Sequence, residues 1–547
     1  MRARWLSLGL LLATATAGAG QQGQRGYRIG GVVVDAVSGA PVARAELSIA
    51  EGTEETKAAA GEDGRFVFPG LSAGKYPLYA TAPGYVREAF NQHGQYSTGI
   101  AVGNGLDSEH VIFRLHRQAV ITGRVTDEHG EAVRQAMVML IHAEGAGGTR
   151  ATSADSVAQT NDLGEYRFAR LAPGRYYVAV MARPWYAQTE LSDVPEAKAE
   201  GADPSSGRSE AKPKRDPLLD AVYPITLYPG VTNEHAAGEL NLTAGEKAEA
   251  DIAVAAVPAV HVHLTNLGVE DRAGSGIEAS VMLFGSEEAP LNISVGQIAP
   301  GEYEVAGLVP GEVTFTISEA GVQASSARKI KAKVGGGDTL DAGGRRTTAK
   351  VSGRVIFPGG DAGPPVMQVK LSAEDERTAM AVSEQDGTFS LPAVEAGTYK
   401  VAVELPRSGA YVANTSATGA KTAGREITIA GAGDVQLSIT LGEGTGQLTG
   451  VAKLEGRPAA GMMVLLAPES GENLEEDSRL DQSDSDGTFT LREILPGKYV
   501  LVAIEEGWDL DRSNWGVLKP YLEKGQALQI AANEQKDVVV KVQRKRE

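Results

Sequence analysis

The sequence of 547 residues contains no cysteine. A disulfide framework is therefore excluded, and so is any site that needs a thiolate, such as a cysteine nucleophile or a cysteine-rich zinc site. Aromatic residues are also scarce, at 5% of the chain, and only four of them are tryptophan. The fold must consequently be stabilised by its hydrophobic cores alone, and few rings remain as candidate ligand contacts.

Excess positive charge is lacking as well, because 52 Lys and Arg residues stand against 70 Asp and Glu residues, which gives a formal net charge of −18. Nucleic acids and anionic membrane surfaces attract basic proteins, so this balance argues against both as partners. Long apolar runs are missing too, since none approaches the length that a transmembrane helix needs. We therefore expect no transmembrane segment.

The first residues of the chain have a pattern of their own. A basic start at Arg2 and Arg4 is followed by a short apolar run and by the small residues 17–19. This order is typical of a secretory signal peptide. We predict a signal peptide at 1–19, cleaved near Ala19, and export to the periplasm, the cell surface or the extracellular medium.

The most informative feature is a hairpin pattern that occurs five times. Its clearest copy runs from Asp486-Gly487 through Phe489 and Leu491 to Tyr499. Asp-Gly is a tight-turn signal, since glycine accepts a positive φ and aspartate bonds locally to the backbone. The alternation of apolar and polar residues indicates strands with one buried face. The five copies centre on Gly64, Gly164, Gly301, Gly387 and Gly487.

Four of the hairpins are preceded by an apolar-x-Gly-x-apolar segment, a turn and a further alternating strand, and are followed by two more short strands. These segments lie at 29–33, 121–125, 351–355 and 448–452. A lone hairpin is marginally stable in water, so each copy must pack on the other strands. Short strands separated by Gly- and Pro-rich turns at this spacing favour an antiparallel β-sandwich.

The predicted fold is therefore all-β, a tandem array of about five seven-stranded Greek-key β-sandwich modules. The predicted modules span 27–117, 118–257, 258–345, 346–444 and 445–547. The second contains a polar insertion at 187–220, whose Glu-, Lys-, Ser- and Pro-rich composition predicts disorder. The third module is degenerate, and we expect no helix of useful length. Modules that contact only their neighbours in sequence would form a rod-like or bent array.

The apolar-x-Gly-x-Val segment and the Asp-Gly-x-Phe-x-Phe-x-x-Leu-x-x-Gly-x-Tyr hairpin together resemble the carboxypeptidase regulatory-like domain. The modules are also similar to collagen-adhesin B-type (Cna B-type) and starch-binding-like modules, although the third matches only in its hairpin. The resemblance implies a transthyretin-like, or prealbumin-like, sandwich. It implies no peptidase activity, because the catalytic domain of that family is a separate α/β unit that no stretch of this chain could hold.

Three local patterns are weak candidates for chemistry. His261 and His263 share one face of a predicted strand with a spacing that could bind zinc, but an exposed strand surface is the simpler interpretation. The segment 484–487 resembles the start of a calcium loop, yet it lacks the closing Glu, so a plain hairpin turn is favoured. Lys453 is a weak candidate for the Lys–Asn isopeptide bond of collagen-adhesin modules. We predict no enzyme, no metal and no cofactor.

Aromatic residues at the loop ends of the modules are the best candidates for binding. Tyr85, Trp185 and Trp508 each follow the second strand of a repeated hairpin, and Tyr186 and Trp515 lie close by. Such rings could stack on a sugar, or each could cap the hydrophobic core of its own module. The sequence therefore predicts an exported, non-catalytic binding or scaffold protein that mediates protein interaction at the cell envelope. The alternative is carbohydrate binding through these aromatics, with a polysaccharide as the partner.

Overall fold

The structure is a computed structural model, and it describes residues 26–51, 54–144, 150–187, 219–267, 276–285, 287–318, 328–342, 348–357, 366–373, 377–404, 410–471 and 473–546. The predicted signal peptide and most of the predicted insertion 187–220 lie outside the described residues. In the part of the chain that is described, no helix is both long and apolar enough to cross a membrane.

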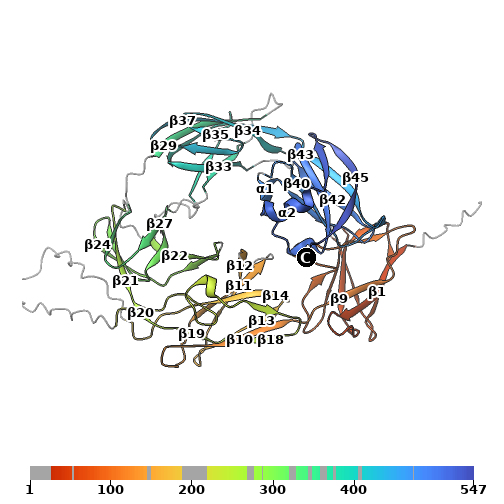
Figure 1. The fold of residues 1–547 in the computed structure, drawn as a ribbon, viewed down its shortest axis with the longest axis horizontal. Helices are drawn as coiled ribbons and strands as arrows, with labels where there is room; N and C mark the ends of the chain where they lie inside the picture. The colour runs from red at the N-terminus through yellow and green to blue at the C-terminus, as the bar shows by residue number, and fades with distance from the viewer. Residues whose placement is uncertain are drawn as a thin grey trace, which may run out of the picture.

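The described chain consists mainly of β-strands that fold into five successive sandwich modules, so the predicted all-β tandem array is confirmed (Figure 1). The predicted module bounds remain predictions, and the modules are defined here by their strands. Module 1 contains β1 (Tyr27–Asp35), β2 (Glu46–Glu51), β3 (Glu54–Ala59), β4 (Arg65–Leu71), β5 (Gly74–Tyr76), β6 (Leu78–Thr81), β7 (Glu88–Ala89), β8 (Ile100–Val102) and β9 (Val111–Leu115). Module 2 contains β10 (Ala119–Thr126), β11 (Met137–Glu144), β12 (Arg150–Gln159), β13 (Glu165–Leu171), β14 (Gly174–Met181), β15 (Ala221–Val222), β16 (Thr226–Leu227), the 3-10 helix η1 (Glu234–Ala236), β17 (Leu240–Leu242), β18 (Lys247–Glu249), β19 (Ile252–Ala253) and β20 (Val257–Pro258).

The other three modules follow the same plan. Module 3 contains β21 (Val260–Thr265), β22 (Gly276–Leu283), β23 (Glu287–Pro290), β24 (Ser294–Ala299), β25 (Glu302–Leu308), β26 (Gly311–Ser318), β27 (Arg328–Val334) and β28 (Asp338–Asp341). Module 4 contains β29 (Thr348–Ile356), β30 (Gln368–Ser372), β31 (Thr378–Val382), β32 (Thr388–Glu395), β33 (Gly397–Val403), β34 (Ala410–Thr418), β35 (Lys421–Ala423), β36 (Glu426–Ile429) and β37 (Gly433–Glu443). Module 5 contains β38 (Gly446–Leu454), β39 (Arg457–Pro458), β40 (Met463–Pro468), α1 (Leu474–Asp477), β41 (Arg479–Gln482), β42 (Thr488–Ile494), β43 (Gly497–Glu505), the 3-10 helix η3 (Gly507–Asp509), α2 (Trp515–Leu522), β44 (Gln526–Ile530) and β45 (Gln535–Arg544).

One pairing pattern recurs in all five modules. The first strand pairs antiparallel with the first strand of the repeated hairpin and parallel with a strand near the end of the module. In module 1 these partners of β1 are β4 and β9, and in module 5 the partners of β38 are β42 and β45. The inward faces of each sandwich meet in a separate hydrophobic core.

The repeated sequence motif has a direct structural cause. In module 4, a Cβ added to Gly353 would lie 2.2 Å from the carbonyl oxygen of Leu437 and 2.5 Å from the ring of Phe389, so only glycine lets the hairpin aromatic lie over β29. The tyrosine that ends the motif donates its hydroxyl to a backbone carbonyl four residues earlier, as Tyr399 does to Glu395 at 3.0 Å. The same bond is made by Tyr76, Tyr176 and Tyr499. The motif therefore encodes both the strand packing and the corner of the hairpin.

The expectation that no helix of useful length occurs is wrong for module 5. The helix α2 has eight residues, and the side chain of Asn514 caps it by accepting a hydrogen bond from the backbone N–H of Gly516. Pro520 lies inside this helix, although proline disfavours a helix interior. Leu518, Tyr521 and Leu522 of α2 are buried against the outer face of β40 and β43, so tertiary packing overrides local propensity here.

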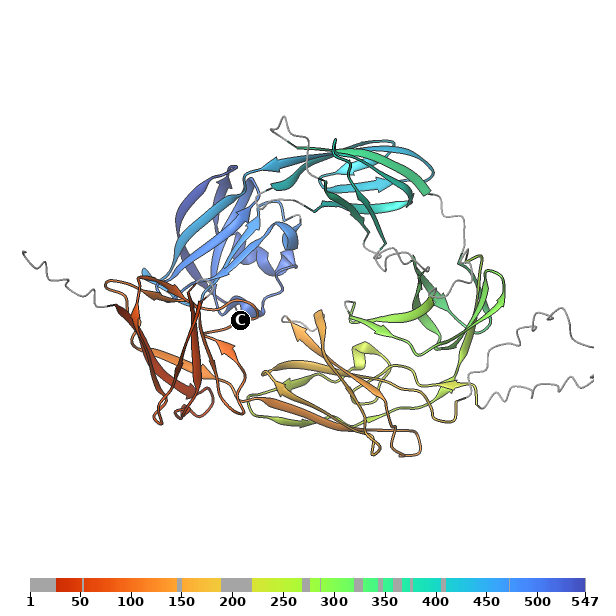
Figure 2. The ribbon, with the colours of Figure 1, turned by 180° about the vertical axis from the view of Figure 1, so that it is seen from behind.

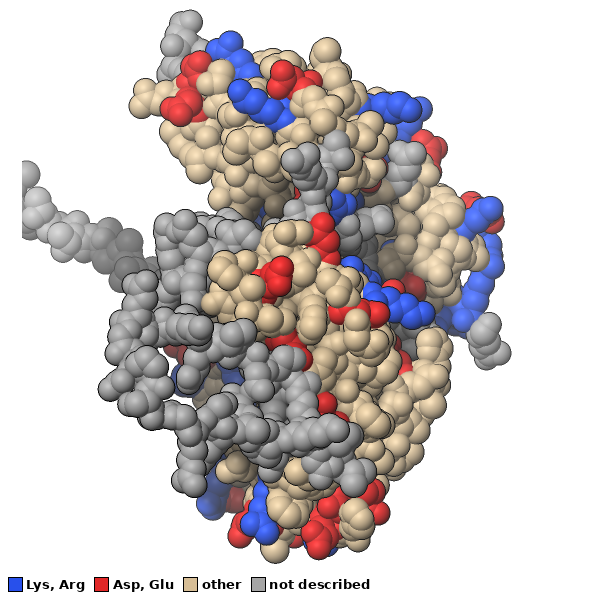
Figure 3. Space-filling view, turned by 90° about the vertical axis from the view of Figure 1, so that its left-hand side faces the viewer, with Lys and Arg blue, Asp and Glu red and all other residues tan. Residues whose placement is uncertain are grey.

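The five modules are arranged in a ring, with module 1 beside module 5 (Figures 1 and 2). The predicted rod-like or bent array is thus bent until its two ends meet. On the face seen in Figure 3, the acidic and basic side chains of the described residues are interspersed over the modules. Among the described residues visible in this view, the acidic side chains do not form one single patch.

Candidate functional site: the module joints and the loop-end aromatics

The contact between modules 1 and 5, called here the seam, is centred on Gln482 at the end of β41. Its side chain is 1% exposed. The amide nitrogen donates to the backbone oxygen of Asn91 at 2.6 Å and to Oγ1 of Thr98 at 2.8 Å, and the amide oxygen lies 3.0 Å from Nδ1 of His93. Both Thr98 and Ser483 are also fully buried. The polar groups in the seam are therefore matched rather than left unsatisfied.

Trp508 forms the aromatic part of the seam. Its ring lies parallel to the ring of His93 from module 1, and the ring of Tyr96 lies 5.5 Å away at an angle of 33°. The indole nitrogen donates to the backbone oxygen of Gly461 at 3.3 Å, which fixes the ring within module 5. This predicted loop-end aromatic is thus half-buried in an intramolecular contact.

The hairpin turn of module 5 supplies the third part of the seam. Asp484 accepts a hydrogen bond from the backbone N–H of Gly99 at 2.9 Å. It also forms an ion pair with Lys75, whose Nζ lies 2.5 Å from the carboxylate. Ser485 exchanges two further bonds with module 1, donating its N–H to Gly99 and accepting from Ala101 N–H. Burial raises the pKa of the Asp484 carboxyl, although Lys75 opposes the shift. The segment 484–487 therefore forms a hairpin turn, as favoured from the sequence, and this turn also contacts module 1.

The turns of the other modules have the same backbone pattern but different side chains. The N–H of residue 484 bonds to the oxygen of residue 488, and Gly61, Asn161 and Glu384 make the same bond in their own turns. Asp484 therefore occupies a position that varies between modules. In module 5 the residue at this position, Asp484, contacts another module, because it bonds to Gly99 and Lys75 of module 1.

Tyr85, another predicted loop-end aromatic, lies in the joint between modules 1 and 2. Its hydroxyl donates to Oδ2 of Asp35 at 3.0 Å, and the same oxygen accepts a 2.7 Å bond from Nε of Arg117. The guanidinium carbon of Arg117 lies 5.0 Å from the centre of the Tyr85 ring. Hydrogen bonds from Ser38 hold the pKa of Asp35 well below its usual range, and Arg117 and Tyr85 add to this effect. The joint is thus held by an ionised, buried carboxylate.

Modules 2 and 3 meet through an apolar face and a histidine. Tyr177 of β14 stacks on Phe284 of module 3 with ring centres 4.5 Å apart, within a shared hydrophobic cluster. His261 lies between Asp220 and Glu304, with its nitrogens 2.7 and 2.8 Å from their carboxylate oxygens. His263 is exposed. The pair considered for zinc is therefore divided between a joint and the surface.

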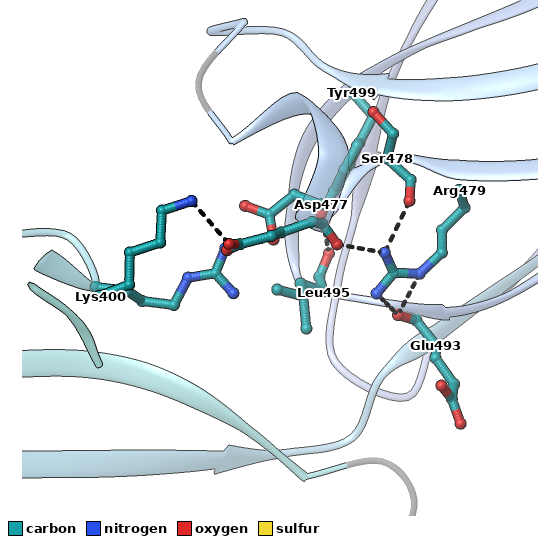
Figure 4. A network of polar contacts seen from close by, with 9 residues as sticks. Lys400, Asp477, Ser478, Arg479, Glu493, Leu495 and Tyr499 are labelled. Atoms are coloured by element: carbon teal, nitrogen blue, oxygen red, sulfur yellow. Dashed lines mark hydrogen bonds and ion pairs between the residues drawn. The ribbon is translucent and has the colours of Figure 1, made fainter. Parts of the chain in front are cut away.

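Modules 4 and 5 are joined by ion pairs at the short helix α1. Lys400 of β33 lies 3.0 Å from Glu476, and Arg425 lies 2.6 Å from Asp477. Figure 4 shows Lys400 reaching from module 4 toward this network, while Arg479 binds the backbone oxygens of Ser478 and Glu493. These contacts fix the helix between the two modules.

The remaining predicted aromatics differ in exposure. Trp515, at the start of α2, is half-buried and lies against Gly471 within module 5. Trp185 is 84% exposed and packs edge-to-face on Tyr186, with ring centres 5.8 Å apart. Tyr186 donates its hydroxyl to Glu128 at 3.0 Å. The proposed ligand role of all five aromatics stays a prediction, and Trp185 offers the most accessible ring of the three tryptophans after residue 19.

Sequence reasoning missed the residues of module 1 that form the seam. Lys75, His93 and Thr98 carried no motif, and neither did their partner Gln482 in module 5. One signal was present, namely that the turn of module 5 departs from the other turns at Asp484. Among the described residues, one group of potential metal ligands gathers within coordinating distance, at Asp127, Glu128 and His129.

Comparison with known proteins supports the family resemblance. Residues 28–112 and 120–204 match the family model of the carboxypeptidase regulatory-like domain. Residues 349–417 match a model described as the second β-sandwich domain of the BOS complex subunit NOMO1-like family. The chain therefore contains carboxypeptidase regulatory-like domains, as its motifs indicated. No curated protein sequence matches the chain significantly.

Several solved structures are similar to this chain at low sequence identity. The Bacillus anthracis TIE protein is 10% identical with a TM-score of 0.16, and the match covers 91% of this chain and 68% of that one. A streptococcal ancillary pilin is 12% identical with a TM-score of 0.20, covering 53% and 99%. BcpA, the major pilin subunit of Bacillus cereus, is 10% identical with a TM-score of 0.14, covering 95% and 99%. At these TM-scores the matches carry no argument about this chain.

Proposed function

We propose that this chain is an exported, non-catalytic scaffold of the cell envelope, whose ring of modules presents fixed surfaces to a protein partner. The observation that carries the proposal is the seam, where buried polar residues of module 5 are matched to module 1. A flexible string of modules would not need such a contact. The ring therefore holds surfaces from different modules in one arrangement, which reduces the entropic cost of binding a partner at several points.

Two further observations support a role without chemistry. The carboxyls with shifted pKa at the joints, Asp35 and Asp484, are occupied by contacts that hold modules together. The matched family descriptions name a regulatory-like domain and a β-sandwich domain of a complex subunit rather than a catalytic domain. Export is supported by the pattern of the first 19 residues.

Carbohydrate binding is the second candidate, and one observation favours it. The ring of Trp185 is 84% exposed, and contact with Tyr186 holds it in place. A fixed, exposed indole is a suitable platform for a sugar ring. Trp508 and Trp515 support this candidate less, because both are half-buried in contacts within the chain.

The test is binding of the purified chain to envelope fragments from the producing cell. Saturable binding that is lost after protease treatment of the fragments supports the scaffold proposal. Binding that survives protease but is lost after periodate oxidation of glycans supports carbohydrate binding instead. An absence of saturable binding would overturn both.

A further inference from the structure

Modules 1 and 2 carry the same buried aspartate at the end of their first strand. Asp35 and Asp127 each stand two residues after a buried valine whose N–H bonds to the glycine of the repeated hairpin. Both aspartates are more than nine-tenths buried, at 3% and 7% exposure. In both, Oδ1 accepts hydrogen bonds from the backbone N–H groups of the turn that follows. The two positions are therefore structurally equivalent.

In module 1 this aspartate and an aromatic ring hold a guanidinium group. Oδ2 of Asp35 accepts Nε of Arg117 at 2.7 Å, and the guanidinium carbon lies 5.0 Å from the centre of the Tyr85 ring. A carboxylate beside an aromatic face is a favourable site for arginine, because the planar cation can bond to the first and stack on the second. Within this chain, the arrangement of a carboxylate beside an aromatic ring thus binds the guanidinium group of an arginine.

Module 2 shares the aspartate with module 1 and adds a second acid, Glu128, and a pair of aromatic rings. Tyr186 bonds to Glu128 and supports the exposed Trp185, while carboxylate oxygens of Asp127 and Glu128 lie within 4.8 Å of each other. Among the described residues, no ion pair connects either carboxylate to a lysine or an arginine. Burial and then these carboxylates raise the pKa of Tyr223, whereas Arg117 partly offsets the rise for Tyr85. Within the described part of the chain, the site therefore has no counterpart of Arg117.

We propose that Asp127, Glu128, Trp185 and Tyr186, called here the module 2 socket, bind an arginine side chain of a partner protein. This inference rests on the proposed scaffold function and specifies its partner as a protein with an exposed arginine. The net charge of −18 favours a basic partner and disfavours a second copy of this chain.

Two other occupants fit the site less well. A divalent cation could reach Asp127, Glu128 and His129, but the backbone N–H groups already occupy Oδ1 of Asp127 and the aromatic rings would contribute nothing. A sugar could stack on Trp185, but it would not neutralise the two adjacent carboxylates. An arginine side chain uses the acids and the rings together.

The test uses the full chain labelled with 5-fluorotryptophan, whose fluorine resonance for Trp185 is assigned with the variant Trp185→Phe. A blocked Gly-Arg-Gly peptide should shift this resonance saturably while leaving that of Trp508 in place. The same peptide with citrulline, which has the shape of arginine without its charge, should give no shift. The variant Asp127→Asn/Glu128→Gln should weaken binding by roughly ten-fold or more, as expected for lost charge-assisted hydrogen bonds.

Asp162→Asn is the matched control, because it removes one exposed charge from a hairpin turn of the same module. It should change the affinity by less than about two-fold, as is usual for surface charges. Equal binding of the citrulline peptide, or unchanged binding by the double variant, would overturn the socket. So would a shift produced by calcium or zinc alone and reversed by EDTA, or by a glycan alone.

The envelope assay separates this inference from the proposed function. Protease-sensitive envelope binding that the double variant retains in full would overturn the socket and leave the scaffold proposal intact. Loss of envelope binding in the double variant, with retention in Asp162→Asn, would support both.

Discussion

The indole of Trp508 lies parallel to the imidazole of His93, with ring centres 4.9 Å apart and planes inclined by 9°. One ring belongs to the last module and the other to the first, so this stack joins the two ends of the array. A loop-end aromatic that the sequence offers to an external ligand is thus in contact with the chain itself. The seam is the feature of the molecule on which most of the following tests depend.

Replacing Trp508 by alanine should open the ring. The variant loses the stack on His93 and the contact with Tyr96, which together should weaken closure by about 1–3 kcal/mol. Because the chain has no cysteine, dyes can be attached at Leu106→Cys and Val539→Cys, two exposed positions in modules 1 and 5, for energy transfer. The efficiency of energy transfer should fall in Trp508→Ala and should remain at the wild-type value in Trp515→Ala. Unchanged transfer in the first variant would mean that the stack does not hold the seam.

Gln482 tests the polar part of the seam. In Gln482→Leu, the backbone oxygen of Asn91 and the hydroxyl of Thr98 lose a buried donor, which should cost about 2–3 kcal/mol of closure. The matched control is Gln535→Leu, the same change at an exposed position of β45. The same dye pair reports the result, and equal transfer in both variants would contradict the expectation.

The pH dependence of the Asp484 contribution should have an unusual sign. Burial raises the pKa of this carboxyl in the folded chain, so the folded state binds the proton more tightly than the unfolded state. The stability of the wild type relative to Asp484→Asn should therefore rise as the pH falls from neutral through the folded pKa. Urea unfolding of both proteins at neutral and mildly acidic pH measures this difference, and a fall would refute the assigned shift.

Asp35 should behave in the opposite way. Hydrogen bonds from Ser38, with those from Tyr85 and Arg117, lower its pKa from the ordinary value of 3.8. Its contribution to stability should be complete above that value and decline as the pH falls below it. In a double-mutant cycle, Asp35→Asn and Arg117→Gln should be non-additive, because each removes the same ion pair. Additive losses in urea unfolding would show that the pair is not coupled.

The repeated tyrosine can be tested in module 4. Tyr399→Phe removes the hydroxyl that donates to the backbone oxygen of Glu395 and should destabilise the module by about 1 kcal/mol. Tyr411→Phe is the control, since no hydrogen bond of its hydroxyl is found among the described residues. Calorimetry of the two variants should show a lower transition for the first alone. Equal transitions would mean that the corner bond contributes nothing net.

The fold was accessible from the sequence because its signals are local. The turn at Gly487 and the alternation after it are dictated by neighbouring residues, and the glycine at 353 by the two strands beside it. The helix α2 was not predicted because it is stabilised by packing on the apolar face of β40 and β43. The sequence alone does not show that these strands lie beside it. Local preference and tertiary packing disagree there, and packing decides.

The candidate sites were harder to predict for the same reason. Tyr85 and Trp508 share with Trp185 a place after a hairpin strand, yet the first two are covered by Arg117 and His93. Which ring is covered depends on how modules pack, and the seam joins segments from opposite parts of the chain. The exposed position of Trp185 is likewise a property of packing.

A closed chain of rigid bodies is a mechanical linkage. In an open array, each hinge angle can change independently of the others. Once the seam joins module 1 to module 5, a rotation at one hinge must be compensated at the remaining hinges or must break the seam. A ligand that rotated module 2 would therefore put a load on the stack of Trp508 on His93, although it makes no contact with either residue.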